Sequence, residues 1–151
     1  MREILFRGKT QNGRWVYGSL IKADDYCCIL ESEENVHPMD YPYLDDELGT
    51  IDGKATPVIQ ETVGQFTGLL DKNGEKIFEG DIVSLTHLTP NPTWDYTSVI
   101  GIVHWCGGAF EVEGVENDDY TPYGWLHDSC EACREIIGNV YDNPKLLEVS
   151  R

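Results

Sequence analysis

The sequence has few basic residues for its length. Across 151 residues, 11 Lys and Arg stand against 27 Asp and Glu, which gives a formal net charge of −16. Residues 23–53 and residues 77–133 contain no Lys or Arg, and each stretch holds ten acidic residues. Because this charge repels phosphate groups, the composition argues against direct nucleic-acid binding.

Long apolar runs are also missing. No stretch reaches the roughly 20 apolar residues of a membrane span, and the first residues lack the hydrophobic core of a signal peptide. We therefore expect a cytoplasmic protein that does not enter a membrane. Apolar residues still make up 40% of the chain. A chain of this length buries about 68–70% of its unfolded surface, so folding requires neither a disulfide nor a metal.

Recognisable catalytic motifs are also absent from the sequence. The sequence contains no Walker loop, dinucleotide-binding fingerprint or nucleophile elbow. Acidic neighbours occur at 45–47 and 118–119, and Glu111 and Glu113 would share one face of a strand. A hydrolase could hold Mg²⁺ with such carboxylates, but no matched base accompanies them, and a solvated acidic surface is favoured. We expect no enzymatic activity, no catalytic residues and no cofactor.

Turn signals between β-prone runs are the main structural feature that is present. Asn12-Gly13, Asn73-Gly74 and Gly107-Gly108 each separate two such runs and predict hairpins. Near the second of these turns, Asp71 and Asp81 are expected to accept hydrogen bonds from backbone amides rather than to perform chemistry. Little helical periodicity is present, so the sequence predicts a mainly β protein.

Two small β subdomains are expected within this class. Residues 1–65 would form an N-terminal β subdomain that ends in an irregular acidic connector. Residues 66–151 would form a C-terminal subdomain that resembles an SH3-like barrel, with residues 86–98 as its long first loop.

The five cysteines are predicted to be reduced thiols, because their number is odd and no secretory signal precedes them. Four residues are candidate zinc ligands: Cys106, His127, Cys130 and Cys133. The spacing His127-x-x-Cys130-x-x-Cys133 provides three N or S ligands, and the His104-x-Cys106 segment would supply a fourth.

Another interpretation of this cysteine pair is structural. Asp128 or Ser129 could cap a short helix over residues 129–136, which would place Cys130 and Cys133 on one side as core cysteines. A thioredoxin-like redox role is weaker, because no βαβ pattern surrounds the pair. A second ligand pair at conventional spacing is missing, so we assign no metal site.

Three sequence blocks carry a family resemblance. They are REILFRGKTQNGRWVYGSL at 2–20, TGLLDKNGEKIFEGDIV at 67–83 and IIGNVYDNPKLL at 136–147. In this order they resemble the YopX family, a group of small proteins encoded by bacteriophages and prophages. The resemblance implies a β-rich, self-associating protein with two subdomains, the second barrel-like. It implies no reaction and no catalytic residues.

Two functions are compatible with these observations. The first is a non-enzymatic module that forms a homo-oligomer and binds a host or phage protein. Residues 1–22 carry a local charge of +4 and would contact an acidic surface of a neighbouring subunit. The alternative is a DNA mimic, in which the acidic residues of 23–53 and 77–133 imitate phosphates and occupy a host DNA-binding protein.

Overall fold

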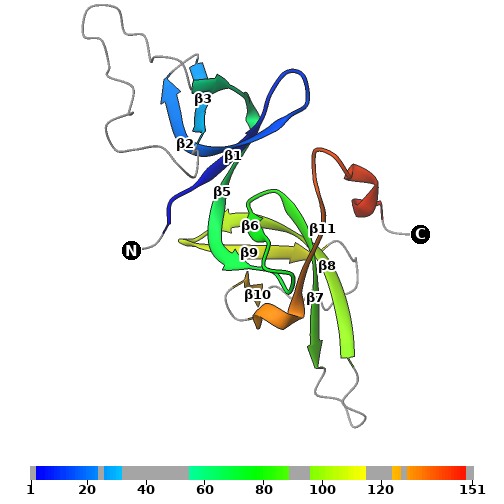
Figure 1. Ribbon diagram of the computed structural model, residues 1–151. Helices are drawn as coiled ribbons and strands as arrows, with labels where there is room; N and C mark the ends of the chain where they lie inside the picture. Colours follow the sequence, from blue (N-terminus) through cyan, green and yellow to red (C-terminus); the bar gives the residue numbers. More distant parts are fainter. Residues whose placement is uncertain are drawn as a thin grey trace, which may run out of the picture. The chain divides into compact units, whose positions relative to one another are not determined.

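The computed structural model describes six segments of the chain (Figure 1). They are residues 3–23, 26–31, 55–88, 96–114, 124–126 and 129–148. The strands are β1 (Phe6–Lys9), β2 (Trp15–Ala23), β3 (Tyr26–Glu31), β4 (Ala55–Pro57), β5 (Ile59–Leu70), β6 (Lys76–Phe78), β7 (Asp81–Leu88), β8 (Tyr96–Cys106), β9 (Ala109–Gly114), β10 (Gly124–Trp125) and β11 (Arg134–Asn139). Two 3₁₀ helices, η3 (Glu131–Cys133) and η4 (Pro144–Leu147), follow β10 and β11. The prediction of a mainly β protein is confirmed.

Two compact units divide the chain, Met1–Gln65 and Phe66–Arg151. In the first unit the strands pair in the order β4-β3-β2-β1-β5, and all of these pairs are antiparallel. Strand β5 continues into the second unit, where its end pairs with β6. No helix among the described residues is long and apolar enough to cross a membrane.

The β1–β2 hairpin forms at Asn12-Gly13, as predicted. Gly13 has a φ of 85°, and its N–H donates to the Thr10 carbonyl at 2.9 Å. A positive φ strains most residues but not glycine, so this turn is set locally. Beyond it, Val16 and Gly18 are buried, whereas Tyr17 between them is exposed. The strand therefore has one core face and one outer face.

The second unit contains a five-stranded antiparallel sheet in the order β10-β9-β8-β7-β11. Its core is formed by inward-facing side chains of these strands, together with Ile77 of β6 and Leu126, which follows β10. The core residues are Ile77, Val83, Val103, Phe110, Val112 and Leu126, with Leu69, Leu85 and Ile136 packed against them. Closure of this sheet into an SH3-like barrel stays a prediction.

The predicted loop at 86–98 is shorter than expected. Strand β7 runs to Leu88 and β8 begins at Tyr96, and these two residues are paired. Figure 1 shows β7 and β8 as two long neighbouring strands. Polar residues such as Thr86 and Thr97 form this extension, because ladder hydrogen bonds come from the backbone and do not require apolar side chains. Only residues 89–95 of the predicted loop lie outside the described residues.

The predicted helix over residues 129–136 is wrong. A single 3₁₀ turn, η3, is followed at once by β11, which pairs with β7. Ser129 caps no helix, since its hydroxyl donates to the Leu126 carbonyl at 2.7 Å. Asp128, the other predicted cap, lies outside the described residues. The β-branched residues Ile136 and Ile137 favour the strand, where β7 provides a partner.

Asp71 and Asp81 accept hydrogen bonds from the backbone, as predicted. Asp81 Oδ2 accepts the Phe78 N–H at 2.7 Å. Asp71 Oδ1 accepts the N–H groups of Asn73 and Glu75 at 2.8 and 3.0 Å. Both side chains are buried. These hydrogen bonds therefore replace the hydrogen bonds to water that each carboxylate loses on burial.

Candidate functional site

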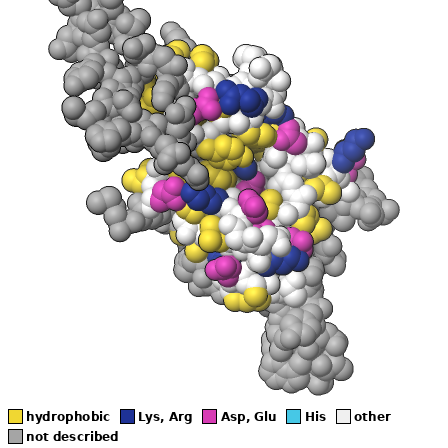
Figure 2. Space-filling view, viewed as in Figure 1, with side chains coloured by type: hydrophobic (Ala, Val, Ile, Leu, Met, Phe, Trp, Pro, Cys, Tyr) yellow, Lys and Arg dark blue, Asp and Glu magenta, His cyan; other side chains and the backbone are white. Residues whose placement is uncertain are grey.

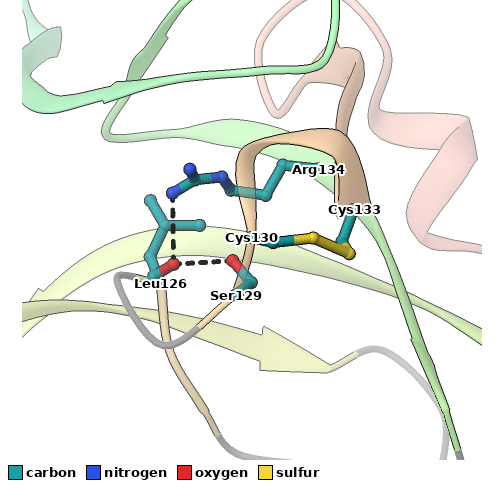
Figure 3. Close-up of a disulfide and its surroundings, with 5 residues drawn as sticks. All are labelled: Leu126, Ser129, Cys130, Cys133 and Arg134. Atoms are coloured by element: carbon teal, nitrogen blue, oxygen red, sulfur yellow. Dashed lines mark hydrogen bonds between the residues drawn. A yellow bond between two sulfur atoms is a disulfide. The ribbon is translucent and has the colours of Figure 1, made fainter.

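Cys130 and Cys133 form a disulfide, with 5.2 Å between their Cα atoms (Figure 3). The prediction that all five cysteines are reduced is therefore wrong for this pair. The core interpretation is wrong as well, because Cys130 is exposed and Cys133 is half-buried. The cause is the 3₁₀ turn η3, since residues three apart lie above one another in this helix type.

Arg134 follows the disulfide and is 5% exposed. Its Nη1 donates to the Leu126 carbonyl at 3.4 Å, the same oxygen that accepts the Ser129 hydroxyl (Figure 3). Burial lowers the pKa of Arg134, and the nearby Glu131 carboxylate acts in the opposite direction. The Nε atom is buried without a hydrogen-bond partner. Arg134 and Ser129 together fasten the segment 124–126 to the disulfide turn.

Cys106 lies at the end of β8 beside two other potential ligands. His104 faces Glu111 directly across the β8–β9 ladder, and Cys106 lies two residues further on the same face. One ligand atom from each of these three side chains lies within 4.8 Å of the others. The His104 Nε2 and Glu111 Oε2 atoms are 3.9 Å apart.

The electrostatics of this cluster are dominated by the carboxylate. The negative charge of Glu111 raises the pKa of the Cys106 thiol, and desolvation and a hydrogen bond between the two side chains act in the same direction. His104 Nδ1 is buried and has no hydrogen-bond partner. The cluster therefore combines a protonated thiol, an incompletely partnered imidazole and a half-buried carboxylate.

The four candidate zinc ligands are distributed differently from the predicted set. Cys106 lies with His104 and Glu111, whereas Cys130 and Cys133 are joined in the disulfide. His127 lies outside the described residues, so a zinc site that includes it stays a prediction. Glu111 was missed as a neighbour of Cys106. The two-residue turn Gly107-Gly108 is the signal that identifies it, because such a turn places His104 opposite Glu111.

The outer face of the β1–β2 hairpin carries aromatic and basic side chains. We call Arg7, Lys9, Trp15 and Tyr17 the β1–β2 face. Lys9 pairs with Trp15 and Arg7 with Tyr17 across the ladder. The Arg7 Cζ atom lies 4.8 Å from the centroid of a Trp15 ring, and Lys9 Nζ lies 5.8 Å from it. Both distances are within the range of cation–π attraction.

The fold and these sites define a β-rich protein of two units, with the β1–β2 face in the first and a disulfide and a His–Cys–Glu cluster in the second. The family model described as YopX protein matches residues 5–148, and the chain belongs to this family. The predicted family membership is thus confirmed.

A solved structure shares the fold. The crystal structure of protein EF1440 from Enterococcus faecalis matches with a TM-score of 0.52 and 22% sequence identity, over 97% of this chain and 99% of that chain. A comparison with curated proteins finds no match.

Proposed function

We propose that this protein is a phage- or prophage-encoded module that self-associates in the host-cell cytoplasm and binds other proteins without catalysing a reaction. The observation that carries the proposal is the β1–β2 face, which presents the exposed Tyr17 and the half-buried Trp15 and Lys9 on a chain with a net charge of −16. A second copy of the chain is the first acidic partner available to it.

The composition of the β1–β2 face is that of an interface. Tyr17 is 44% exposed, while Trp15 and Lys9 are half-buried. Tyr, Trp and Arg are the residue types that contribute most to protein–protein binding. Arg7 is buried against the indole ring. The Arg7 guanidinium lies against the indole and limits the freedom of the Trp15 side chain, so less side-chain entropy is lost when this face binds a partner.

The DNA-mimic alternative receives less support from the described acidic residues. Asp81 is buried and bonded to the Phe78 amide. The Glu31 carboxylate accepts hydrogen bonds from both terminal nitrogens of Arg14, at 3.1 and 3.0 Å. Figure 2 shows the described Asp and Glu side chains interspersed with Lys, Arg and hydrophobic ones on the face that it draws. A mimic of DNA needs carboxylates in regular rows, as phosphates are spaced.

Self-association is tested by light scattering of the purified chain at micromolar concentration, in about 0.05 M and about 0.5 M salt. We expect a mass above the 17.1 kDa of one chain at low salt and a smaller mass at high salt. A monomer at low salt would refute self-association.

A charge reversal locates the interface. The double substitution Lys9→Glu with Tyr17→Ser is expected to give a monomer at both salt concentrations. Lys22→Glu is the matched control, because it makes the same charge change on the opposite face of β2. Loss of the oligomer in both variants would show that net charge, rather than the β1–β2 face, governs association.

The DNA-mimic function has its own test. A tagged chain is mixed with a bacterial lysate, and bound proteins are eluted with DNA duplex. Release of a DNA-binding protein by the duplex would favour mimicry over the module proposed here.

A further inference from the structure

The β8–β9 hairpin brings an imidazole, a thiol and a carboxylate together on one strand face. We propose that His104, Cys106 and Glu111 hold one divalent cation of the zinc class, with a further coordination position left open. This site differs from the predicted zinc set, with which it shares only Cys106.

The backbone fixes this grouping. Gly107 and Gly108 have φ values of 57° and 100°, the left-handed values that a two-residue hairpin turn requires. The turn pairs Cys106 with Ala109, and the same register places His104 opposite Glu111. Because side chains alternate along a strand, His104 and Cys106 share the face on which Glu111 lies. Rigid strands rather than a loop therefore carry all three groups.

On the opposite face of the hairpin end, Phe110 is buried and Trp105 is 51% exposed. Trp105 and Phe110 pair across the ladder, with ring centroids 5.0 Å apart in an edge-to-face arrangement. Such a pair adds stability beyond the area that it buries. It holds the end of the hairpin, and thus the three polar side chains on the other face, in place.

The distances and the donor types fit a small, borderline-soft cation. Zinc binds His nitrogen, Cys sulfur and carboxylate oxygen, and in a tetrahedron its ligand atoms lie about 3.3–3.8 Å apart. The three ligand atoms here already lie within 4.8 Å of one another, a gap that side-chain rotation closes. A thiolate and an imidazole favour zinc-class ions over Mg²⁺ or Ca²⁺, which prefer oxygen ligands.

The two nitrogens of the His104 ring have different surroundings. His104 Nδ1 is buried and lacks a hydrogen-bond partner. Unsatisfied buried polar atoms are uncommon in folded proteins, and each has a free-energy cost. A cation in the cluster would bind Nε2 of the same ring, which lies 3.9 Å from Glu111 Oε2, so coordination would hold the ring in place but would not supply a partner for Nδ1. The Cys130 and Cys133 sulfurs are joined in the disulfide, so they do not compete for the cation as thiolates while that bond persists.

Titration of Co²⁺ into the purified full chain, without added reductant, tests the site. Thiolate coordination to Co²⁺ produces a charge-transfer absorption band, which we expect to saturate at one ion per chain. Cys106→Ser should abolish the band, and His104→Gln or Glu111→Gln should weaken binding by at least about tenfold. Glu113→Gln is the matched control, because it removes the next outward carboxylate on β9 and should leave binding unchanged.

A thiol assay gives a second readout. Cys106 is exposed, whereas the other two free cysteines, Cys27 and Cys28, are buried. A thiol reagent should therefore modify one cysteine of the native chain, and Zn²⁺ should protect it. Circular dichroism spectra verify that each variant is folded.

Three results would overturn the proposal. They are the absence of both the band and the protection, a band that persists in Cys106→Ser, and equal weakening by Glu111→Gln and Glu113→Gln. A band lost only in the Cys130→Ser, Cys133→Ser double variant would assign the ion to that pair instead.

Discussion

Asp71 and Ile136 are 65 positions apart in the chain, yet the Ile136 N–H donates to the Asp71 carboxylate at 3.2 Å. The bond joins the turn after β5 to β11. Beside it, the Lys72 N–H donates to the Arg134 carbonyl at 2.9 Å. These two bonds occupy backbone groups on the side of β11 that β7 leaves unpaired. Because the Ile136 N–H and the Arg134 carbonyl are occupied, this edge of the sheet is a poor template for another strand.

Removal of the Asp71 carboxylate should destabilise the protein. Asp71 is 1% exposed, and Asp71→Ala leaves the amides of Asn73, Glu75 and Ile136 without this acceptor. We expect a loss of about 2–4 kcal/mol in the free energy of unfolding, measured with urea. Glu75→Ala, which truncates an exposed acid in the same turn, is the control and should change little. Equal losses would show that the three bonds are not the cause.

The same carboxylate predicts a pH dependence. Burial by itself would raise the pKa of Asp71, but the N–H groups of Glu75, Asn73 and Ile136 outweigh it and lower the pKa below its ordinary value. The stability that the carboxylate provides is therefore full above the unfolded pKa of about 3.9 and is lost as the pH falls through the folded value.

Urea titrations between about pH 6 and pH 2 measure this loss. Asp71→Asn should flatten the curve in the acid range, because the amide does not titrate. Part of the dependence of stability on pH should remain in this variant, because hydrogen bonds from Arg14 and Thr56 lower the pKa of Glu31 as well. An unchanged slope in Asp71→Asn would contradict the assignment.

Two glycine substitutions should differ in their effect on stability. A Cβ on Gly101 would lie 2.5 Å from Val112 Cγ1 and 2.6 Å from the Glu113 carbonyl oxygen, so Gly101→Ala should cost about 1–3 kcal/mol. Gly74 has a φ of 81°, with open space around its Cβ position. Asn tolerates this conformation, and Gly74→Asn should be close to neutral. Thermal unfolding of both variants decides the matter, and a similar decrease in Tm would contradict the packing argument.

Cysteine alkylation tests the disulfide. In denaturant, an alkylating reagent should label three cysteines before reduction and all five afterwards, because only Cys130 and Cys133 are bonded. Mass spectrometry counts the labels. The closed loop is short, so the Cys130→Ser, Cys133→Ser double variant should lose no more than about 2 kcal/mol. Five labels without reduction would show that the pair is reduced in the isolated protein.

Local signals in the sequence were sufficient for the hairpins but not for the contacts between distant elements. Gly13 and Gly74 mark turns because their conformation is set by neighbouring residues. The pairing of β11 with β7 and the bond from Ile136 to Asp71 depend on chain reversals that no local pattern encodes. The disulfide was missed because its cause is a single 3₁₀ turn, where the sequence also allows a longer helix.

The candidate site depends on the register of one hairpin. His104 and Cys106 are recognisable as potential ligands, but Glu111 becomes their neighbour only when the register of the hairpin is known. Trp15 and Tyr17 share one face of β2 because side chains alternate along a strand. The placement of Arg7 against the indole depends on the pairing of β1 with β2, which the position of Gly13 alone does not define.

Strand β5 has an evolutionary consequence for the two units. Gln65 pairs with Phe6 in the first unit, and the next residue, Phe66, pairs with Phe78 in the second. No spacer separates these pairings, so one inserted or deleted residue would reverse the faces of all that follows in the strand. Recombination between relatives can therefore exchange the halves only where the crossover keeps the alternation of core-facing and solvent-facing residues along β5.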